Sequence, residues 1–202
     1  MSHYQQHILS RYCLSPISIA DHQADFDHQA AVLIPLIKNG DDYDVLFTIR
    51  AAHLRHHGGQ ISFPGGRHDH SDPTLCHTAV RECIEEIGAK PDYVLGSLPR
   101  YISNSGFEIT PFLGVFEQFP TLKLSPDEVD SSFSVPLSFL LDARHHVCLP
   151  IQKGHRILDV YWIAWNGHYI WGVTAGIIHT LYSHIKGINV SSERAARYPL
   201  QR

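Results

Sequence analysis

The 202-residue sequence lacks a long hydrophobic segment and has few cysteines. Its longest apolar run, residues 30–37, is well short of the roughly 20 residues that a transmembrane helix needs. The first 20 residues contain no apolar run of the signal-peptide type. The four cysteines include no CxxC pair, which argues against a zinc ribbon or a redox motif. We therefore expect a cytoplasmic protein with reduced thiols and no membrane association.

The sequence also lacks a marked excess of charge of either sign. The chain has 16 Lys and Arg against 20 Asp and Glu, a formal net charge of -4, and no long basic run. Nucleic acids and anionic membranes are bound through clustered basic side chains, so we expect neither as a partner. A small polyanionic ligand would need a local group of basic residues. The sequence leaves open whether the protein forms a homodimer.

Histidine, by contrast, is abundant, with 16 residues. One group falls within a short stretch: His53, His56, His57, His68 and His70. A zinc-binding interaction domain is one reading of this group. No cysteine lies at zinc-ligand spacing and no HExxH pair occurs, so we expect solvated loop histidines instead.

Apolar and β-branched segments predict a strand-rich chain with two or three helices. Strands are expected at 30–37, 44–49, 60–63, 93–103, 107–116, 147–151 and 157–165. Helices are expected at 73–87, from about 135 to 141, and at 177–185, and an acidic loop at 126–130. The turn at 39–42 predicts a hairpin between the first two strands. The order indicates one mixed α/β (α+β) domain at 29–190, between an N-terminal extension at 1–28, expected to be a short helix or strap, and a tail at 191–202.

The helix at 73–87 has clear signals at both ends. Asp72 suits the N-cap, Pro73 the first helical position, and Gly88 the C-terminal stop. Its core face is expected to consist of Cys76, Val80, Cys83, Ile84 and Ile87.

The other side of this helix carries three carboxylates, Glu82, Glu85 and Glu86, at three- and four-residue spacings. Like charges on one helical stripe repel by a few tenths of a kcal/mol per pair. A divalent cation such as Mg²⁺ or Mn²⁺ converts this repulsion into ligation by hard oxygens. Arg81 can pair with Glu85 and fix its rotamer. A solvated acidic face is the alternative for any such run taken alone.

Residues 66–89 resemble the box of the Nudix hydrolase family. Gly66 begins the match, and the run RECIEEIGA at 81–89 ends it. Asp72 stands where the family has its first glutamate, and eight residues rather than seven separate it from Arg81. The resemblance implies an α/β/α sandwich with a mixed β-sheet and hydrolysis of a phosphoanhydride. It also implies the Gly66 carbonyl as a further metal ligand beside Glu82, Glu85 and Glu86.

The preceding segment, LFTIRAAHLRHHGGQISFPGG at 46–66, is similar to the signature of the coenzyme A pyrophosphatase branch of that family. The matching residues are Leu46, Thr48, Arg50, Ala51, Arg55, Gly59, Phe63, Pro64, Gly65 and Gly66. The branch also accepts the aspartate and the extra residue in the box. This resemblance implies cleavage of coenzyme A or its derivatives to 4′-phosphopantetheine and adenosine 3′,5′-bisphosphate.

Two arginines in this segment have the right chemistry for such a substrate. Arg50 and Arg55 offer planar donor forks that suit phosphate oxygens, so we expect both to bind substrate, although surface ion pairs are the alternative. The general base stays open, either a box carboxylate or one of three later carboxylates, Glu108, Glu117 and Glu128. Other Nudix substrates also stay open, namely ADP-ribose, dinucleotides and nucleoside triphosphates. A Nudix-fold module that binds without catalysis is a further alternative.

Overall fold

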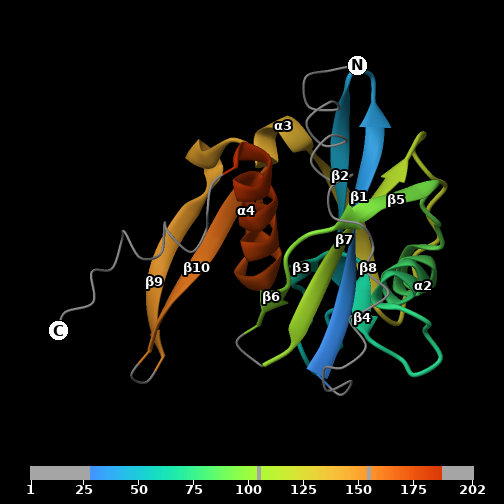
Figure 1. Ribbon diagram of the computed structural model, residues 1–202, viewed down its shortest axis with the longest axis horizontal. Coiled ribbons are helices and arrows are strands. Elements are labelled where there is room, and N and C mark those ends of the chain that lie inside the picture. The colour runs from blue at the N-terminus through green and yellow to red at the C-terminus, as the bar shows by residue number, and fades with distance from the viewer. Residues whose placement is uncertain (1–27, 104–105, 154–155, 188–202) are drawn as a thin grey trace.

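Two β-sheets and two long helices make up most of what the computed structural model describes, residues 28–103, 106–153 and 156–187 (Figure 1). The larger sheet has eight strands: β1 Gln29–Asn39, β2 Asp42–Arg50, β3 Ile61–Ser62, β4 Gly65–Arg67, β5 Tyr93–Ser97, β6 Tyr101–Ile102, β7 Glu108–Phe116 and β8 Val129–Pro136. The smaller sheet has three: β9 Val147–Lys153, β10 Arg156–Trp165 and β11 His168–Trp171. The helices are α2 Leu75–Ile87, the single turn α3 Leu137–Leu140, the 3-10 turn η2 Ala143–His145, and α4 Gly172–Lys186.

Strand β1 lies in the middle of the larger sheet because its sequence is apolar on both faces. It pairs in parallel with β7 along its length and antiparallel with β2, which confirms the predicted hairpin and makes the sheet mixed. It also pairs with β4, so that Ala31 lies opposite Gly66. This pairing brings the Pro-Gly-Gly segment beside helix α2.

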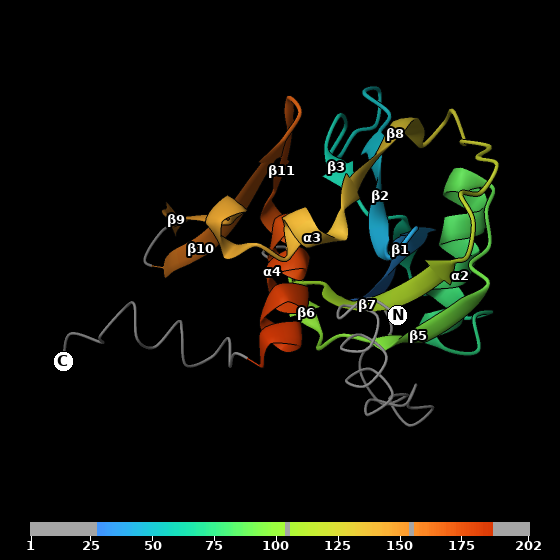
Figure 2. The ribbon, with the colours of Figure 1, turned by 90° about the horizontal axis from the view of Figure 1, so that it is seen from above.

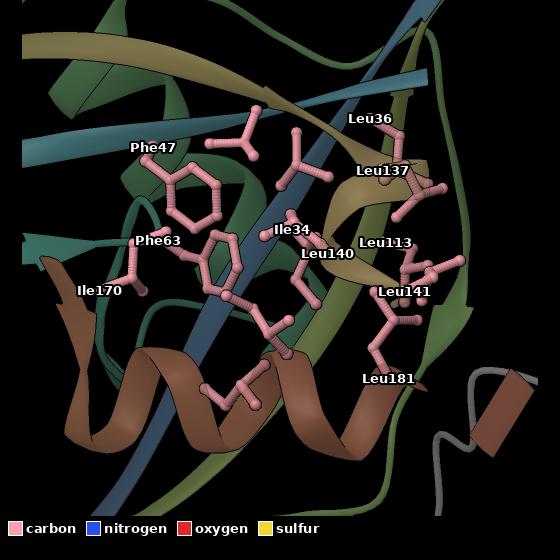
Figure 3. Close-up of a cluster of buried hydrophobic side chains, with 14 of the residues drawn as sticks. Ile34, Leu36, Phe47, Phe63, Leu113, Leu137, Leu140, Leu141, Ile170 and Leu181 are labelled. Atoms are coloured by element: carbon pink, nitrogen blue, oxygen red, sulfur yellow. The ribbon is translucent and has the colours of Figure 1, made fainter. Parts of the chain in front are cut away.

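Each face of the larger sheet is covered by one long helix. Helix α2 packs on one face, over a core cluster that includes Leu33, Cys83 and Ile87. Helix α4 packs on the other face, and the smaller sheet lies on its far side (Figures 1 and 2). Figure 3 shows the second core cluster, in which α4 contributes Leu181 and the larger sheet Ile34. The predicted mixed sheet between helical layers is confirmed.

Three strands were not predicted, and the reason is local. β4 and β11 are only three and four residues long, and β8 is rich in serine. The loop predicted at 126–130 is confirmed for 126–128, but pairing with β2 holds Val129–Pro136 as a strand. The helix predicted from about 135 therefore begins at Leu137. Helix α4 begins five residues before its predicted start, and no side chain caps it, so the sequence carries no start signal there.

The regular elements described run from Gln29 to Lys186, so the domain limits at 29 and 190 stay predictions. The expected helix or strap at 1–28 lies, except for His28, outside the described residues. Among the described helices, none is long and apolar enough to cross a bilayer.

The half-buried His146 and the buried His179 join the turn that follows α3 to α4. His146 Nε2 lies 2.8 Å from the Leu140 carbonyl oxygen, which only accepts, so Nε2 donates. The neutral ring then accepts at Nδ1, and His179 Nδ1 donates to it across 3.2 Å. His179 Nε2 in turn faces the Ser183 hydroxyl at 3.5 Å. With both rings neutral, this arrangement of protons satisfies all three contacts.

The free energy of unfolding is therefore expected to fall as the pH drops below 6.5. Burial, aided by the neighbouring His145, lowers the pKa of His146, while the Leu140 carbonyl and Asp142 oppose this. Between the folded pKa and 6.5 the unfolded chain binds more protons, so acidification favours unfolding. Urea titrations from pH 8 to pH 5 should show a flatter slope for His146→Gln than for wild type. Equal slopes for His146→Gln and wild type would contradict the assignment.

Candidate active site

Helix α2 begins two residues later than predicted. Thr74 is its N-cap, and its hydroxyl accepts a hydrogen bond from the His77 amide at 3.3 Å. Asp72 is not the cap, so that prediction was wrong, because its carboxylate is engaged elsewhere. The C-terminal stop is confirmed: Gly88 is left-handed, with φ of 70°, and its amide donates to the Ile84 carbonyl.

The carboxylate of Asp72 is held by Arg81, which organises this end of the site. Arg81 Nη2 lies 2.9 Å from Asp72 Oδ2. Its Nη1 reaches Glu82 Oε1 at 2.8 Å and Glu85 Oε2 at 2.9 Å, which confirms the predicted Arg81–Glu85 pair. Nη2 also donates to the Arg67 carbonyl at 3.3 Å. One guanidinium thus fixes Glu82 relative to strand β4.

Removing the Asp72 charge is expected to destabilise the fold. Its side chain is only 6% exposed, and the Arg81 guanidinium lowers its pKa. Asp72→Asn should therefore lower the free energy of unfolding by about 2 kcal/mol at pH 7, as for other charged hydrogen bonds. Since the folded pKa is lowered, this contribution exists above pH 3.8 and is lost as the pH falls through the folded pKa. Urea unfolding at pH 7 measures the loss.

Arg144→Gln is the matched control, because Arg144 pairs with Asp142 while its side chain is 86% exposed. An exposed pair contributes about 0–1 kcal/mol. Similar losses for the two variants would show that the Asp72 pair is no more than a surface contact.

Three carboxylates meet at the end of the site opposite the cap. Oxygen atoms of Glu82, Glu86 and Glu128 lie within 4.8 Å of one another. Glu128 arrives there because the loop before β8 is tied to the end of α2: the Ser125 amide donates to the Glu86 carbonyl at 2.9 Å. The Ala51 amide donates to the Glu128 carbonyl, also at 2.9 Å, which joins this loop to the end of β2. We call this group the carboxylate triad.

Glu86 is the buried member of the triad, at 2% exposure. Its Oε1 accepts a hydrogen bond from the Gly65 amide at 3.3 Å, while its buried Oε2 has no hydrogen-bond partner among the described residues. Burial raises the pKa of Glu86 to about 8; the Gly65 amide and the Arg50 charge oppose this, and the two neighbouring carboxylates add to it. A buried carboxylate with an unpaired oxygen beside two more carboxylates fits a divalent cation.

The glycines of β4 lie in close contact with their neighbours, and at Gly65 the contact is with backbone atoms that cannot move aside. A Cβ on Gly66 would overlap the carboxylate of Glu82, and one on Gly65 would overlap Ala31 and Val32 of β1. Glu82 therefore packs directly on the backbone at Gly66. The role of the Gly66 carbonyl as a ligand stays a prediction.

The structure divides the predicted site residues into two groups. It brings together Glu82, Glu86 and Glu128, with Arg50 near enough to act on the pKa of Glu86. It leaves Glu85 outside the triad, with a 55% exposed side chain held by Arg81. Ile84, predicted for the core face, is 43% exposed, so that prediction was wrong.

The three candidate bases are also separated. Glu108 pairs with Arg100 at 3.2 Å, and Glu117 pairs with Lys38 at 2.9 Å, whereas Glu128 lies in the triad. In the part of the chain that the structure describes, the triad is the one group of three potential metal-binding side chains that lie this close together.

The NUDIX domain matches residues 27–166, and the chain belongs to the Nudix hydrolase family. It is 39% identical over 181 residues to the uncharacterized Nudix hydrolase NudL of Salmonella heidelberg (strain SL476), covering 87% of this chain and 91% of that protein. It is 41% identical over 159 residues to the NudL of Enterobacter sp. (strain 638), covering 76% and 80%.

Among solved structures, a MutT/nudix family protein from Enterococcus faecalis aligns with a TM-score of 0.51 at 15% identity, over 98% of this chain and 85% of that chain. This likeness supports the fold alone. The family match and the NudL relatives make the protein a Nudix pyrophosphatase, an enzyme class that generally uses divalent metal ions.

Proposed function

We propose that the enzyme hydrolyses the diphosphate of coenzyme A or its derivatives, giving 4′-phosphopantetheine and adenosine 3′,5′-bisphosphate. The observation that carries the proposal is the position of Arg50. It ends β2 beside the carboxylate triad, and among the described residues its guanidinium forms no ion pair. A free guanidinium next to a cation site suits a phosphate that binds to both.

The loop that follows Arg50 supports the same reading. The Gly59 amide donates to the Arg50 carbonyl and the Arg50 amide to the Gln60 carbonyl, both at 2.9 Å, so the loop closes at its base. Arg55 lies exposed within it, and no described carboxylate forms an ion pair with it. Coenzyme A has a diphosphate and a separate 3′-phosphate, and two unpaired arginines, one at the end of β2 and one on this loop, offer donors for both.

Glu82, Glu86 and Glu128 would hold Mg²⁺ or Mn²⁺, since both prefer hard oxygen ligands. When bound, such a cation neutralises charge on phosphate oxygens and lowers the pKa of a coordinated water. Arg81 keeps Glu82 oriented by sharing its guanidinium between Glu82 and Asp72. Arg50 and Arg55 bind and orient the substrate phosphates. Water adds across the phosphoanhydride, so that one P–O bond breaks and each product keeps one phosphate of the former diphosphate.

A panel of diphosphates tests the substrate. With Mg²⁺ or Mn²⁺, kcat/KM for coenzyme A and acyl-coenzyme A should exceed that for ADP-ribose and NADH by at least about tenfold, the effect of roughly 1.4 kcal/mol. Glu86→Gln, assayed in parallel, reports contaminating activity. A clear preference for ADP-ribose, a dinucleotide or a nucleoside triphosphate would reject coenzyme A while leaving the Nudix chemistry in place.

A further inference from the structure

The smaller sheet has one face covered and one face open. In its central strand β10, Tyr161 and Ile163 are buried in the core cluster that includes α4. Side chains alternate along a strand, so Val160 and Trp162 point away from α4. A strand that is apolar on both faces is typical of one with a layer on each side. The same face carries Trp165 and His168, which contact Phe139 of α3 and Phe133 of β8, so the described elements that pack on this sheet do so on the side of α4.

Cross-strand pairs make the open face continuous. On β9 and β10, Val147 lies opposite Trp162, Leu149 opposite Val160, and Ile151 opposite Leu158. On β10 and β11, Trp162 lies opposite Trp171 and Ala164 opposite Tyr169. The two tryptophan rings stack, with centroids 5.3 Å apart. These nine residues, which we call the outer face, include no charged side chain.

The outer face is also exposed. Five of the ten exposed large hydrophobic residues in the described part of the chain belong to it: Val147, Leu149, Ile151, Tyr169 and Trp171, each 40–65% exposed. The other five are Ile84, Tyr93, Ile102, Phe119 and Ile157, and they come from five separate segments. Contiguous exposed apolar patches of this kind mark interaction surfaces, whereas single exposed residues are ordinary.

We propose that the outer face binds the outer face of a second copy of this chain. An uncharged, flat surface is matched by another uncharged surface. Among the described residues, the outer face is the one place where exposed apolar side chains gather, so the outer face of a second copy supplies the matching surface. Two sheet faces pack about 10 Å apart, and a twofold axis makes such a contact self-complementary. Side chains of this size and exposure present on the order of 500 Å² per copy, so a pair buries about 1,000 Å², the size of a weak but specific interface.

The proposed interface leaves the carboxylate triad open. Helix α2, which carries Glu82 and Glu86, lies on the opposite side of the larger sheet from β9 and β10 (Figures 1 and 2). Substitutions on the outer face should therefore change the association of the protein and leave its catalytic activity unchanged.

Sedimentation equilibrium of the full chain tests the proposal. The wild type should shift from 22.8 kDa toward twice that mass as its concentration rises from about 1 to 200 µM, the range for a micromolar dissociation constant. Leu149→Glu and Tyr169→Glu, on two different strands, should raise that constant more than tenfold, since each puts an unpaired carboxylate into the interface. Phe119→Glu is the matched control, because Phe119 is 60% exposed and lies outside the outer face.

Circular dichroism and metal-dependent hydrolysis establish that each variant is folded. A wild type that stays at 22.8 kDa over this range, or a dimer that survives both outer-face substitutions, would overturn the proposal. Flotation of monomeric wild type with neutral phosphatidylcholine vesicles, lost in Leu149→Glu, would replace the second copy with a lipid surface.

Discussion

Glu86→Gln is expected to lower kcat by on the order of 10²–10⁴-fold and to leave the fold intact. Glu86 is the buried member of the carboxylate triad, and within the described part of the chain its Oε2 has no hydrogen-bond partner. Glutamine keeps the shape and the acceptor for the Gly65 amide but removes the charge that a divalent cation needs. Steady-state hydrolysis of coenzyme A at saturating Mg²⁺ or Mn²⁺ measures the loss.

The same substitution should not weaken the metal-free protein. The folded pKa of Glu86 is raised from 4.5 to about 8, so the folded state favours the protonated carboxyl. Wild-type stability should therefore decline as the pH rises from 4.5 through 8, whereas Glu86→Gln lacks this decline. Urea unfolding in EDTA at pH 6 and pH 9 separates a loss of activity from a loss of fold.

Glu85→Gln is the matched control on the same helix. Its carboxylate lies outside the triad and is held by Arg81, so a loss of less than about tenfold is expected, as for one exposed ion pair. Equal losses at Glu85 and Glu86 would restore Glu85 to the ligand set that the sequence predicted.

The helix of the site was predictable from its sequence because both of its ends carry local signals. Gly88 stops it as expected, but its N-cap is Thr74 rather than the predicted Asp72. Both residue types cap helices, and what separates them is the Arg81 guanidinium, nine residues away from Asp72 in the chain. The capping preferences of single residues do not reveal a contact between residues so far apart in the chain.

How deeply each glutamate is buried could not be predicted from local sequence signals. A helical wheel places Glu86 with Glu82 and Glu85, but it does not say how far the neighbouring strands extend around the helix. Here Glu86 is buried and accepts a hydrogen bond from the Gly65 amide of β4, while Ile84 is exposed. Glu128 was one of three equal candidates, because its approach depends on backbone hydrogen bonds between the loop before β8 and the end of α2.

Glu128→Gln is expected to have the second-largest effect, a loss in kcat/KM on the order of 10²-fold or more. Glu128 is the triad member that is exposed, and it comes from the loop before β8 rather than from α2. It can therefore act either as a cation ligand or as the base that accepts a proton from the attacking water. The two roles differ in how activity depends on the metal concentration.

A Mn²⁺ titration of Glu128→Gln separates these roles. If Glu128 is a ligand, the half-saturating metal concentration should rise, and excess metal should recover much of the lost kcat. If Glu128 is the base, that concentration should stay near the wild-type value and kcat should remain low at saturation, with weakened dependence on pH. Glu108→Gln and Glu117→Gln are the controls, since both carboxylates pair with surface cations outside the triad. A greater loss in either control than in Glu128→Gln would move the base away from the triad.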